Sequence, residues 1–205
     1  MIAALLFSGL FCQALADGPG EVEYLLKQPL IRAGIPINRE SLIHALNNKS
    51  ILIAGNSALL LPRFPKTRRM VEALTALVEN DQDPQREILA VNAARSLVQL
   101  NERDWVPKAL ARLPKLRDRV SQVQLAGLLA RVGHAEGWPI VRDTLTDENL
   151  ALVALENVAY FNRLRDENGQ TINVVEELNR LSSQAPEGAR KLIEEKLIEL
   201  RKKNR

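Results

Sequence analysis

The sequence predicts an all-α protein built of repeated helical hairpins, and three observations carry this prediction. Apolar residues recur at the spacing of a helix face along most of the chain. Segments of similar pattern return every 32 to 36 residues, a period typical of stacked helix pairs. No stretch shows the alternation of apolar and polar residues expected of a half-buried strand. We therefore expect about five hairpins stacked into a right-handed α-α superhelix.

The order of the elements follows from this repeat and from the turn residues. Residues 17–37 are expected to form an N-terminal cap, irregular except for a short helix near 21–28. A repeat domain over residues 38–205 follows, with hairpins expected over residues 38–63, 67–101, 104–133, 138–164 and 171–203. Pro107 and Pro139 fall where a helix begins, since the first turn tolerates a missing N–H. Gly133, Gly137 and Gly169 indicate breaks between helices.

The second helices of four hairpins align without gaps. The segments ILIAGNSALLLPR, EILAVNAARSLVQ, RVSQVQLAGLLAR and ALVALENVAYFNR are related by shifts of 36, 32 and 32 residues. Four columns of this alignment are apolar and lie on one arc of the helix, which predicts a buried stripe. The columns are Leu52, Ile88, Val120 and Leu152; Gly55, Val91, Val123 and Leu155; Ala58, Ala94, Ala126 and Val158; and Leu61, Leu97, Leu129 and Phe161.

One line of the repeat resembles a known class. VEALTALVENDQDPQREILAVNAARSL has a leucine-rich first helix, an Asp/Pro turn and an alanine-rich second helix, and it resembles a HEAT repeat. Over residues 38–203 the pattern is similar to HEAT-type solenoids of the armadillo-like superfamily. The resemblance implies an architecture with a curved binding face and no particular activity. Glu87 stands near the place where many HEAT units carry arginine, so their usual polar ladder is not expected here.

The first sixteen residues, MIAALLFSGLFCQALA, are almost wholly apolar and carry no charged side chain. They are similar to a secretory signal peptide, and they are shorter than the roughly 20 residues of a membrane span. Ala14 and Ala16 lie at the small-residue positions that signal peptidase requires. We expect cleavage after Ala16, a periplasmic or secreted mature chain, and no transmembrane span after cleavage. A buried first helix is the alternative, favoured by the lack of basic residues near Met1.

Composition restricts the chemistry open to the chain. With 46% apolar and 26% charged residues among 205, it is expected to fold as an ordinary globular protein. One cysteine and two histidines exclude a disulfide framework and a zinc or iron-sulfur site built from several such ligands. No HEXXH, GXSXG or glycine-rich phosphate loop occurs. We expect no catalytic residues, no bound metal and no cofactor.

A polar row is predicted on the side of the second helices that faces away from the apolar arc. Amides can hydrogen-bond a peptide backbone, and arginines can pair with carboxylates in a bidentate way. By resemblance to armadillo-like grooves, the amides would hold an extended chain; an ordinary solvated helix face is the alternative. The row and its neighbours are Asn56, Arg63, Asn92, Arg95, Gln99, Gln124, Arg131, Glu156, Tyr160 and Arg163.

Two basic segments add local positive charge, although the net charge is only +3. They contain Arg63, Lys66, Arg68 and Arg69, and Lys108, Arg112, Lys115, Arg117 and Arg119. A DNA-glycosylase family and bilin lyases have similar folds, so the alternative function is a nucleic-acid-binding or lyase-like protein that is not exported. We favour an exported scaffold that binds a protein or peptide partner, acidic in character, and not nucleic acid.

Overall fold

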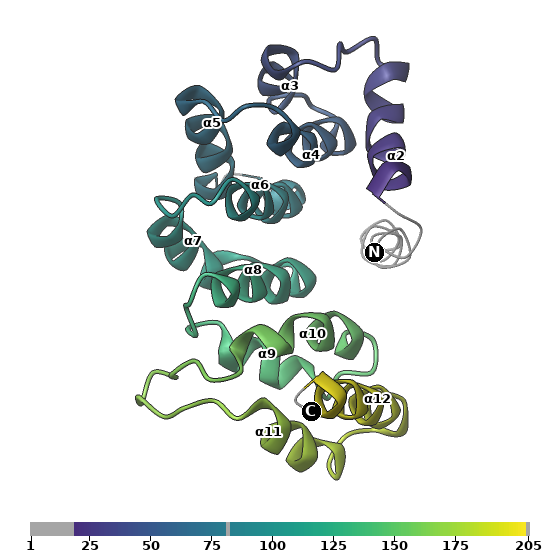
Figure 1. The fold of residues 1–205 in the computed structure, drawn as a ribbon, viewed down its shortest axis with the longest axis vertical. Coiled ribbons are helices and arrows are strands. Elements are labelled where there is room, and N and C mark those ends of the chain that lie inside the picture. Colours follow the sequence, from purple (N-terminus) through teal and green to yellow (C-terminus); the bar gives the residue numbers. More distant parts are fainter. Residues whose placement is uncertain (1–18, 81–82, 204–205) are drawn as a thin grey trace. The chain divides into compact units, whose positions relative to one another are not determined.

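The computed structural model describes residues 19–80 and 83–203, and within these ranges the chain is all-α (Figure 1). It forms eleven α-helices there. The β structure of these residues is an isolated antiparallel bridge between Arg165 and Thr171. No helix in this part of the chain is long and apolar enough to cross a membrane. The predicted signal peptide at residues 1–16 and its cleavage after Ala16 lie outside the described residues.

The chain divides into two compact units, and the first covers residues 1–112. Its helices are α2 (Pro19–Arg32), α3 (Arg39–Ala45), α4 (Ile51–Leu60), α5 (Arg68–Glu79), α6 (Glu87–Gln99) and α7 (Val106–Arg112). α3 packs on α4 and α5 packs on α6, as two of the predicted hairpins require. α4 also packs on α6, and α5 packs on α7. Second helices therefore contact second helices, and first helices contact first helices.

The second unit covers residues 113–205. It contains α8 (Arg119–Arg131), α9 (Trp138–Thr144), α10 (Ala151–Val158), α11 (Val174–Ser182) and α12 (Glu187–Lys203). α9 packs on α10 and α11 packs on α12, again as predicted hairpins. α10 lies against both α8 and α12, so these three second helices are stacked in sequence order. The predicted hairpin at 104–133 consists of α7 and α8, which belong to different units.

Short polar side chains begin several of these helices. Each accepts a hydrogen bond from the backbone N–H three residues further on, which satisfies one of the unpaired donors at the helix start. The capping residues are Asn38, Ser50, Thr67, Asp118 and Asn173. The two prolines also lie as predicted, in the first turns of α7 and α9.

The N-terminal helix is longer than the sequence pattern indicates. A short helix near 21–28 was expected, and α2 extends over Pro19–Arg32, so less of the cap is irregular than predicted. α2 ends at Arg32, and Gly34 follows with a φ of +69°, which glycine adopts without strain. Leu30 is fully buried and α2 packs on α4. The length of α2 thus reflects a tertiary contact, which periodicity within the segment does not reveal.

Three of the four apolar columns are buried as predicted, whereas in the first column only Val120 is buried. Leu52 and Leu152 are 43% and 54% exposed, and Ile88 is half-buried. Neighbouring columns are three residues apart, and three residues turn an α-helix by about 300°, which leaves each column about 60° from the next. The four columns therefore spread over about 180° of the helix surface. The first column lies at the edge of that arc, beyond the stripe that the neighbouring helices cover.

Small residues in the third column allow neighbouring helices to come unusually close. Gly137, at the start of α9, lies against Ala126 of α8, and a Cβ added to Gly137 would lie 2.9 Å from the Ala126 Cα and closer still to its Cβ. Gly127, on the same helix α8, lies directly under the Asn157 side chain of α10. α8 is therefore in close contact with both members of the next hairpin.

Replacing Gly137 by alanine should lower the free energy of unfolding by about 1–3 kcal/mol, because overpacking against a backbone atom has no side chain to relieve it. Urea denaturation followed by circular dichroism measures the change. Gly188→Ala is the matched control, since its nearest neighbour would be 3.5 Å away, and it should be neutral or stabilising by up to about 1 kcal/mol. Adding Ala126→Gly to Gly137→Ala should restore part of the loss. Equal effects of the two alanines would contradict this account.

Candidate functional site

The polar row predicted on the second helices divides into a buried set and an exposed set. Asn56, Asn92 and Gln124 are only 2%, 6% and 9% exposed, so the prediction that these amides face solvent is wrong. Arg95 and Glu156 are half-buried. The exposed members lie at or beyond the C-terminal ends of the second helices: Arg63, Gln99, Arg131, Tyr160 and Arg163.

The amides of the first unit are buried because α4 has a neighbour on the side that a two-layer hairpin would leave open. α2 packs on that side, while α3 and α6 pack elsewhere on α4. Asn92 of α6 is buried for a related reason, since its Nδ2 lies 2.9 Å from the place where a Cβ of Gly55 would stand. Helix periodicity describes one helix at a time, and it does not reveal a third or fourth neighbour.

The contact between α4 and α2 uses the chemistry expected for a partner. The Asn56 Nδ2 donates a hydrogen bond of 2.9 Å to the backbone oxygen of Leu26. Two turns further along the chain, the Arg63 Nε lies 3.8 Å from a carboxylate oxygen of Glu23. The Lys27 ammonium, with a smaller contribution from Arg63, holds the pKa of Glu23 below its usual value. An amide thus binds a peptide carbonyl, and an arginine lies beside a carboxylate, within one unit.

Three exposed residues of the second unit form a group that we call the Arg131 cluster: Arg131, Tyr160 and Arg163. Arg131 ends α8, and its guanidinium carbon lies 5.1 Å from the centroid of the Tyr160 ring, a cation-π contact. Tyr160 is 43% exposed and lies in the 3-10 turn Ala159–Phe161 that follows α10. The sequence alignment placed these residues in one row, and the structure brings Arg131 and Tyr160 together.

Arg163 is held in an uncommon backbone conformation. Its φ is +71°, in the left-handed region that non-glycine residues rarely adopt. The Arg163 N–H donates a hydrogen bond of 2.9 Å to the Ile172 oxygen, and the bridge between Arg165 and Thr171 follows directly. This small ribbon fixes where the chain leaves α10, and the sequence analysis indicated only a break at Gly169.

An open groove of about 640 Å³ lies beside this ribbon. Its lining is mostly polar, with amide side chains from the loop and from α11. Most of these amides already have local partners: Asn162 and Asn173 accept hydrogen bonds from the backbone at the start of α11, and Asn179 donates to the Val175 oxygen. The lining residues are Asn162, Arg163, Thr171, Ile172, Asn173, Val175, Glu176 and Asn179.

The basic segment at residues 63–69 does not present free positive charge. Each of its four cations lies within ion-pair distance of a glutamate in the first unit, and for most of these pairs the glutamate comes from another element. The pairs are Arg63 with Glu23, Lys66 with Glu102, Arg68 with Glu72 and Arg69 with Glu40. Exposed pairs of this kind add little stability. Their glutamates nevertheless neutralise the positive charge that would be needed to bind a polyanion.

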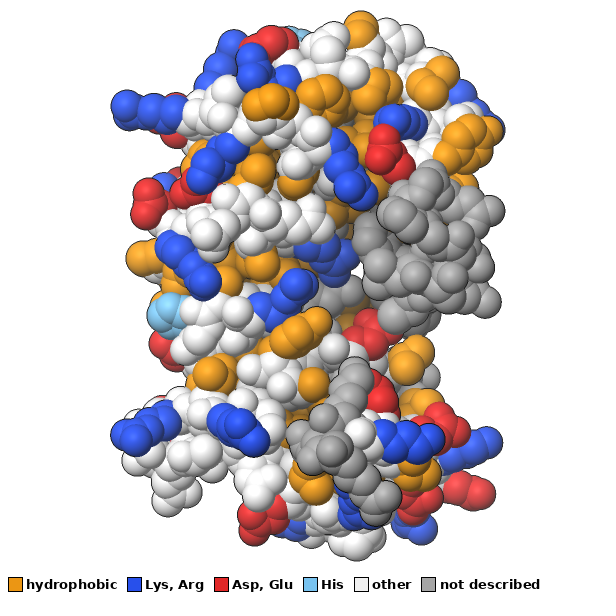
Figure 2. All heavy atoms as spheres, viewed as in Figure 1, with side chains coloured by type: hydrophobic (Ala, Val, Ile, Leu, Met, Phe, Trp, Pro, Cys, Tyr) orange, Lys and Arg blue, Asp and Glu red, His pale blue; other side chains and the backbone are white. Residues whose placement is uncertain are grey.

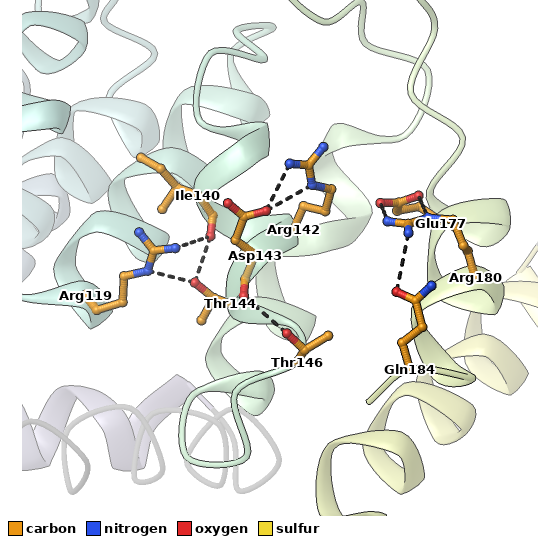
Figure 3. A network of polar contacts seen from close by, with 9 residues as sticks. All are labelled: Arg119, Ile140, Arg142, Asp143, Thr144, Thr146, Glu177, Arg180 and Gln184. Carbon is orange, nitrogen blue, oxygen red and sulfur yellow. Dashed lines mark hydrogen bonds and ion pairs between the residues drawn. The ribbon is translucent and has the colours of Figure 1, made fainter. Parts of the chain in front are cut away.

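The cations of the second basic segment are partly engaged and partly buried. Lys108 pairs with Glu79 at 2.6 Å, and Arg112 is 4% exposed. Arg119 donates hydrogen bonds to the Thr144 hydroxyl and to the Ile140 oxygen, and so ties α8 to α9 (Figure 3). On the face drawn in Figure 2, blue Lys and Arg side chains are interspersed with red, white and orange surface. The expectation of two locally positive patches is therefore not met for these residues.

Figure 3 also shows a strong pair on α11. Arg180 donates hydrogen bonds of 2.6 and 2.9 Å to the two carboxylate oxygens of Glu177. These hydrogen bonds hold the pKa of Glu177 below its usual value, and the same pair raises the pKa of Arg180. The pair spans one turn of a single helix, so its role is to stabilise α11.

The histidines and tryptophans have ordinary surroundings. His44 is exposed on α3, and the His134 Nδ1 lies 3.5 Å from a Glu136 oxygen. The indole of the buried Trp105 donates to the Glu102 oxygen at 3.0 Å, and Trp138 packs on Phe161 with ring centroids 5.4 Å apart. Within the residues that the structure describes, no group of three potential metal ligands is found.

No protein family model, curated protein or solved structure gives a significant match to the chain. Membership of the HEAT class thus stays a prediction from the sequence pattern.

Changing Asn56 to aspartate should detach α2 from α4. The carboxylate has no proton to donate to the Leu26 oxygen and would be buried unpaired, so we expect a loss of about 2–4 kcal/mol in the free energy of unfolding. Thermal unfolding measures the loss, and hydrogen exchange should show faster exchange for the amides of α2. Gln99→Glu makes the same charge change at an exposed site and should change stability by less than about 0.5 kcal/mol. Slow exchange in α2 of the Asn56→Asp variant would contradict the assignment.

Proposed function

We propose that the protein is an exported, non-catalytic helical-repeat protein that binds or scaffolds a protein partner through exposed side chains at the C-terminal ends of its second helices. The observation that carries the proposal is the Arg131 cluster. It combines two arginines and a tyrosine, which are the residue types enriched at protein interfaces. All three side chains are exposed at or beyond the ends of α8 and α10, where a partner can reach them, and Arg131 contacts Tyr160.

The cluster favours an acidic partner. The structure gives neither Arg131 nor Arg163 an ion pair within the described residues. Most cations on the first helices, by contrast, lie within ion-pair distance of a carboxylate. Stacking on Tyr160 leaves the N–H groups at the rim of the Arg131 guanidinium available for a carboxylate. The backbone hydrogen bond at Arg163 keeps that residue in a strained conformation, and such strain is often retained where it positions a functional group. Protein or peptide carboxylates therefore fit this surface.

The architecture we propose is a right-handed HEAT-like solenoid. Its support is the ungapped alignment of the second helices together with their ordered stacking inside each unit. Stacked hairpins give a rigid surface and few deep pockets, and this suits scaffolding better than catalysis. A nucleic-acid partner has less support, because the basic segments are compensated by glutamates.

Reversing both arginines, Arg131→Glu with Arg163→Glu, should lower recovery of the crosslinked partner by about tenfold or more. The substitutions replace two positive guanidinium groups by two carboxylates, and these repel an acidic partner surface. The measurement is quantitative mass spectrometry of the host proteins that become crosslinked to the purified wild type or variant. Circular dichroism verifies that the variant is folded. Lys191→Glu with Lys202→Glu is the matched control, since it makes the same charge change on α12. Unchanged recovery in the arginine variant would remove the cluster from the binding site.

Export is tested separately by the intact mass of the protein recovered from its native host after fractionation. We expect a chain that begins at Asp17 and is found outside the cytoplasm, because Ala14 and Ala16 match the requirement of signal peptidase. Such a chain would contain no cysteine, since Cys12 lies in the removed segment. A full-length chain in the cytosol would refute export and favour the alternative functions.

A further inference from the structure

The chain already contains one helix docked on the polar face of a second helix. α2 lies on α4, held by the hydrogen bond from Asn56 to the Leu26 oxygen and by the approach of Arg63 to Glu23. Glu23, which precedes Leu26 in α2, meets Arg63, which follows Asn56 in the chain. The two helices therefore run antiparallel. The docked helix thus supplies one carboxylate and, three residues later, one backbone carbonyl.

α8 repeats the pair of groups that receives α2. In the alignment of second helices, Asn56 falls on Gln124 and Arg63 falls on Arg131, seven residues apart in each case. Seven residues are close to two full turns, so the amide and the arginine share one helix face. The other two aligned helices lack one member each, because α6 has Gln99 in place of the arginine and α10 has Glu156 in place of the amide.

Gln124 differs from Asn56 in having no acceptor. Its side chain is 9% exposed, and it makes no hydrogen bond in the part of the chain that the structure describes. The Gln124 amide atoms are not among the buried atoms that lack a hydrogen-bond partner, whereas the Asn56 Oδ1 is, so the Gln124 amide still reaches water and is available to donate to a ligand carbonyl. Asn56 shows what that ligand is at the equivalent site, since its amide binds the backbone oxygen of a helix.

Apolar contact is available beside these two groups. α8 packs on α10 and on the turn Ala159–Phe161. Leu152 and Tyr160 from these elements are 54% and 43% exposed. A helix lying along α8 with a carboxylate near Arg131 would cover part of this surface with its own apolar residues.

We propose that α8 is a second helix-docking face, in which Gln124, Arg131 and Tyr160 receive an amphipathic helix of a partner protein that presents a carboxylate to Arg131 and runs antiparallel to α8. The inference rests on the proposed function, since it names the kind of segment that the same surface binds. The carboxylate of the partner lies at Arg131, and a backbone carbonyl one turn later in its helix accepts the hydrogen bond from Gln124. Both contacts copy those that α4 makes with α2.

The probe for this face is a labelled peptide with the sequence of α2, PGEVEYLLKQPLIR, added to the full-length protein. Fluorescence anisotropy should show saturable binding, and Arg131→Glu and Gln124→Met should each weaken it at least about fivefold. A peptide with Glu23→Lys should bind the wild type equally poorly and should regain affinity for Arg131→Glu. Lys191→Glu is the control for charge on the same unit, and it should leave binding unchanged.

Three results would overturn the inference. The first is no saturable binding, or binding that Arg131→Glu and Gln124→Met do not change. The second is equal binding of a peptide carrying Leu26→Pro, which cannot form the helix and would show that the face takes an extended chain. The third is binding lost only in Arg63→Glu, which would show exchange with α2 on α4. Capture of a native partner that depends on Arg131, without peptide binding, would refute this inference and leave the proposed function standing.

Discussion

Close contact between successive second helices is the constraint on which the rest of the structure depends. In the first unit Asn92 of α6 lies against Gly55 of α4, and the Ser96 hydroxyl donates to the Ala58 oxygen at 2.8 Å. In the second unit Gly127 of α8 lies against Asn157 of α10. A Cβ at Gly127 would overlap the Asn157 side chain, and a Cβ at Gly55 would press on the Asn92 amide. The small residues therefore set the spacing at which each hairpin meets its neighbour.

This spacing decides which polar groups can reach a partner. When the bodies of the second helices are packed on several sides, an amide near the middle of a helix is removed from solvent, as Asn56 and Asn92 are. The helix ends project beyond the packed region, so Arg131 and Arg163 remain accessible. The proposed binding surface is accordingly a set of helix ends. The amides near the middle of the helices can hydrogen-bond only to a segment that packs directly against them.

The contact of α2 with α4 connects stability with recognition. It uses an amide, a carbonyl, an arginine and a carboxylate, the same groups that would serve an intermolecular contact. The difference between the two roles is covalent linkage, because a docked segment of the same chain is present at a high effective concentration. A face of similar chemistry, as proposed for α8, receives its helix from a partner protein.

The sequence alone determined the helical class, most hairpin limits, three of the four buried columns and the closeness of Arg131 to Tyr160. These features follow from the 3.6-residue period and from residue type, which are local properties. Tertiary structure decided the length of α2, the exposure of Leu52 and Leu152, the burial of the amides and the pairing of the basic segments. Each of these depends on a neighbour far away in the chain, and a single helix pattern contains no information about how many neighbours surround it.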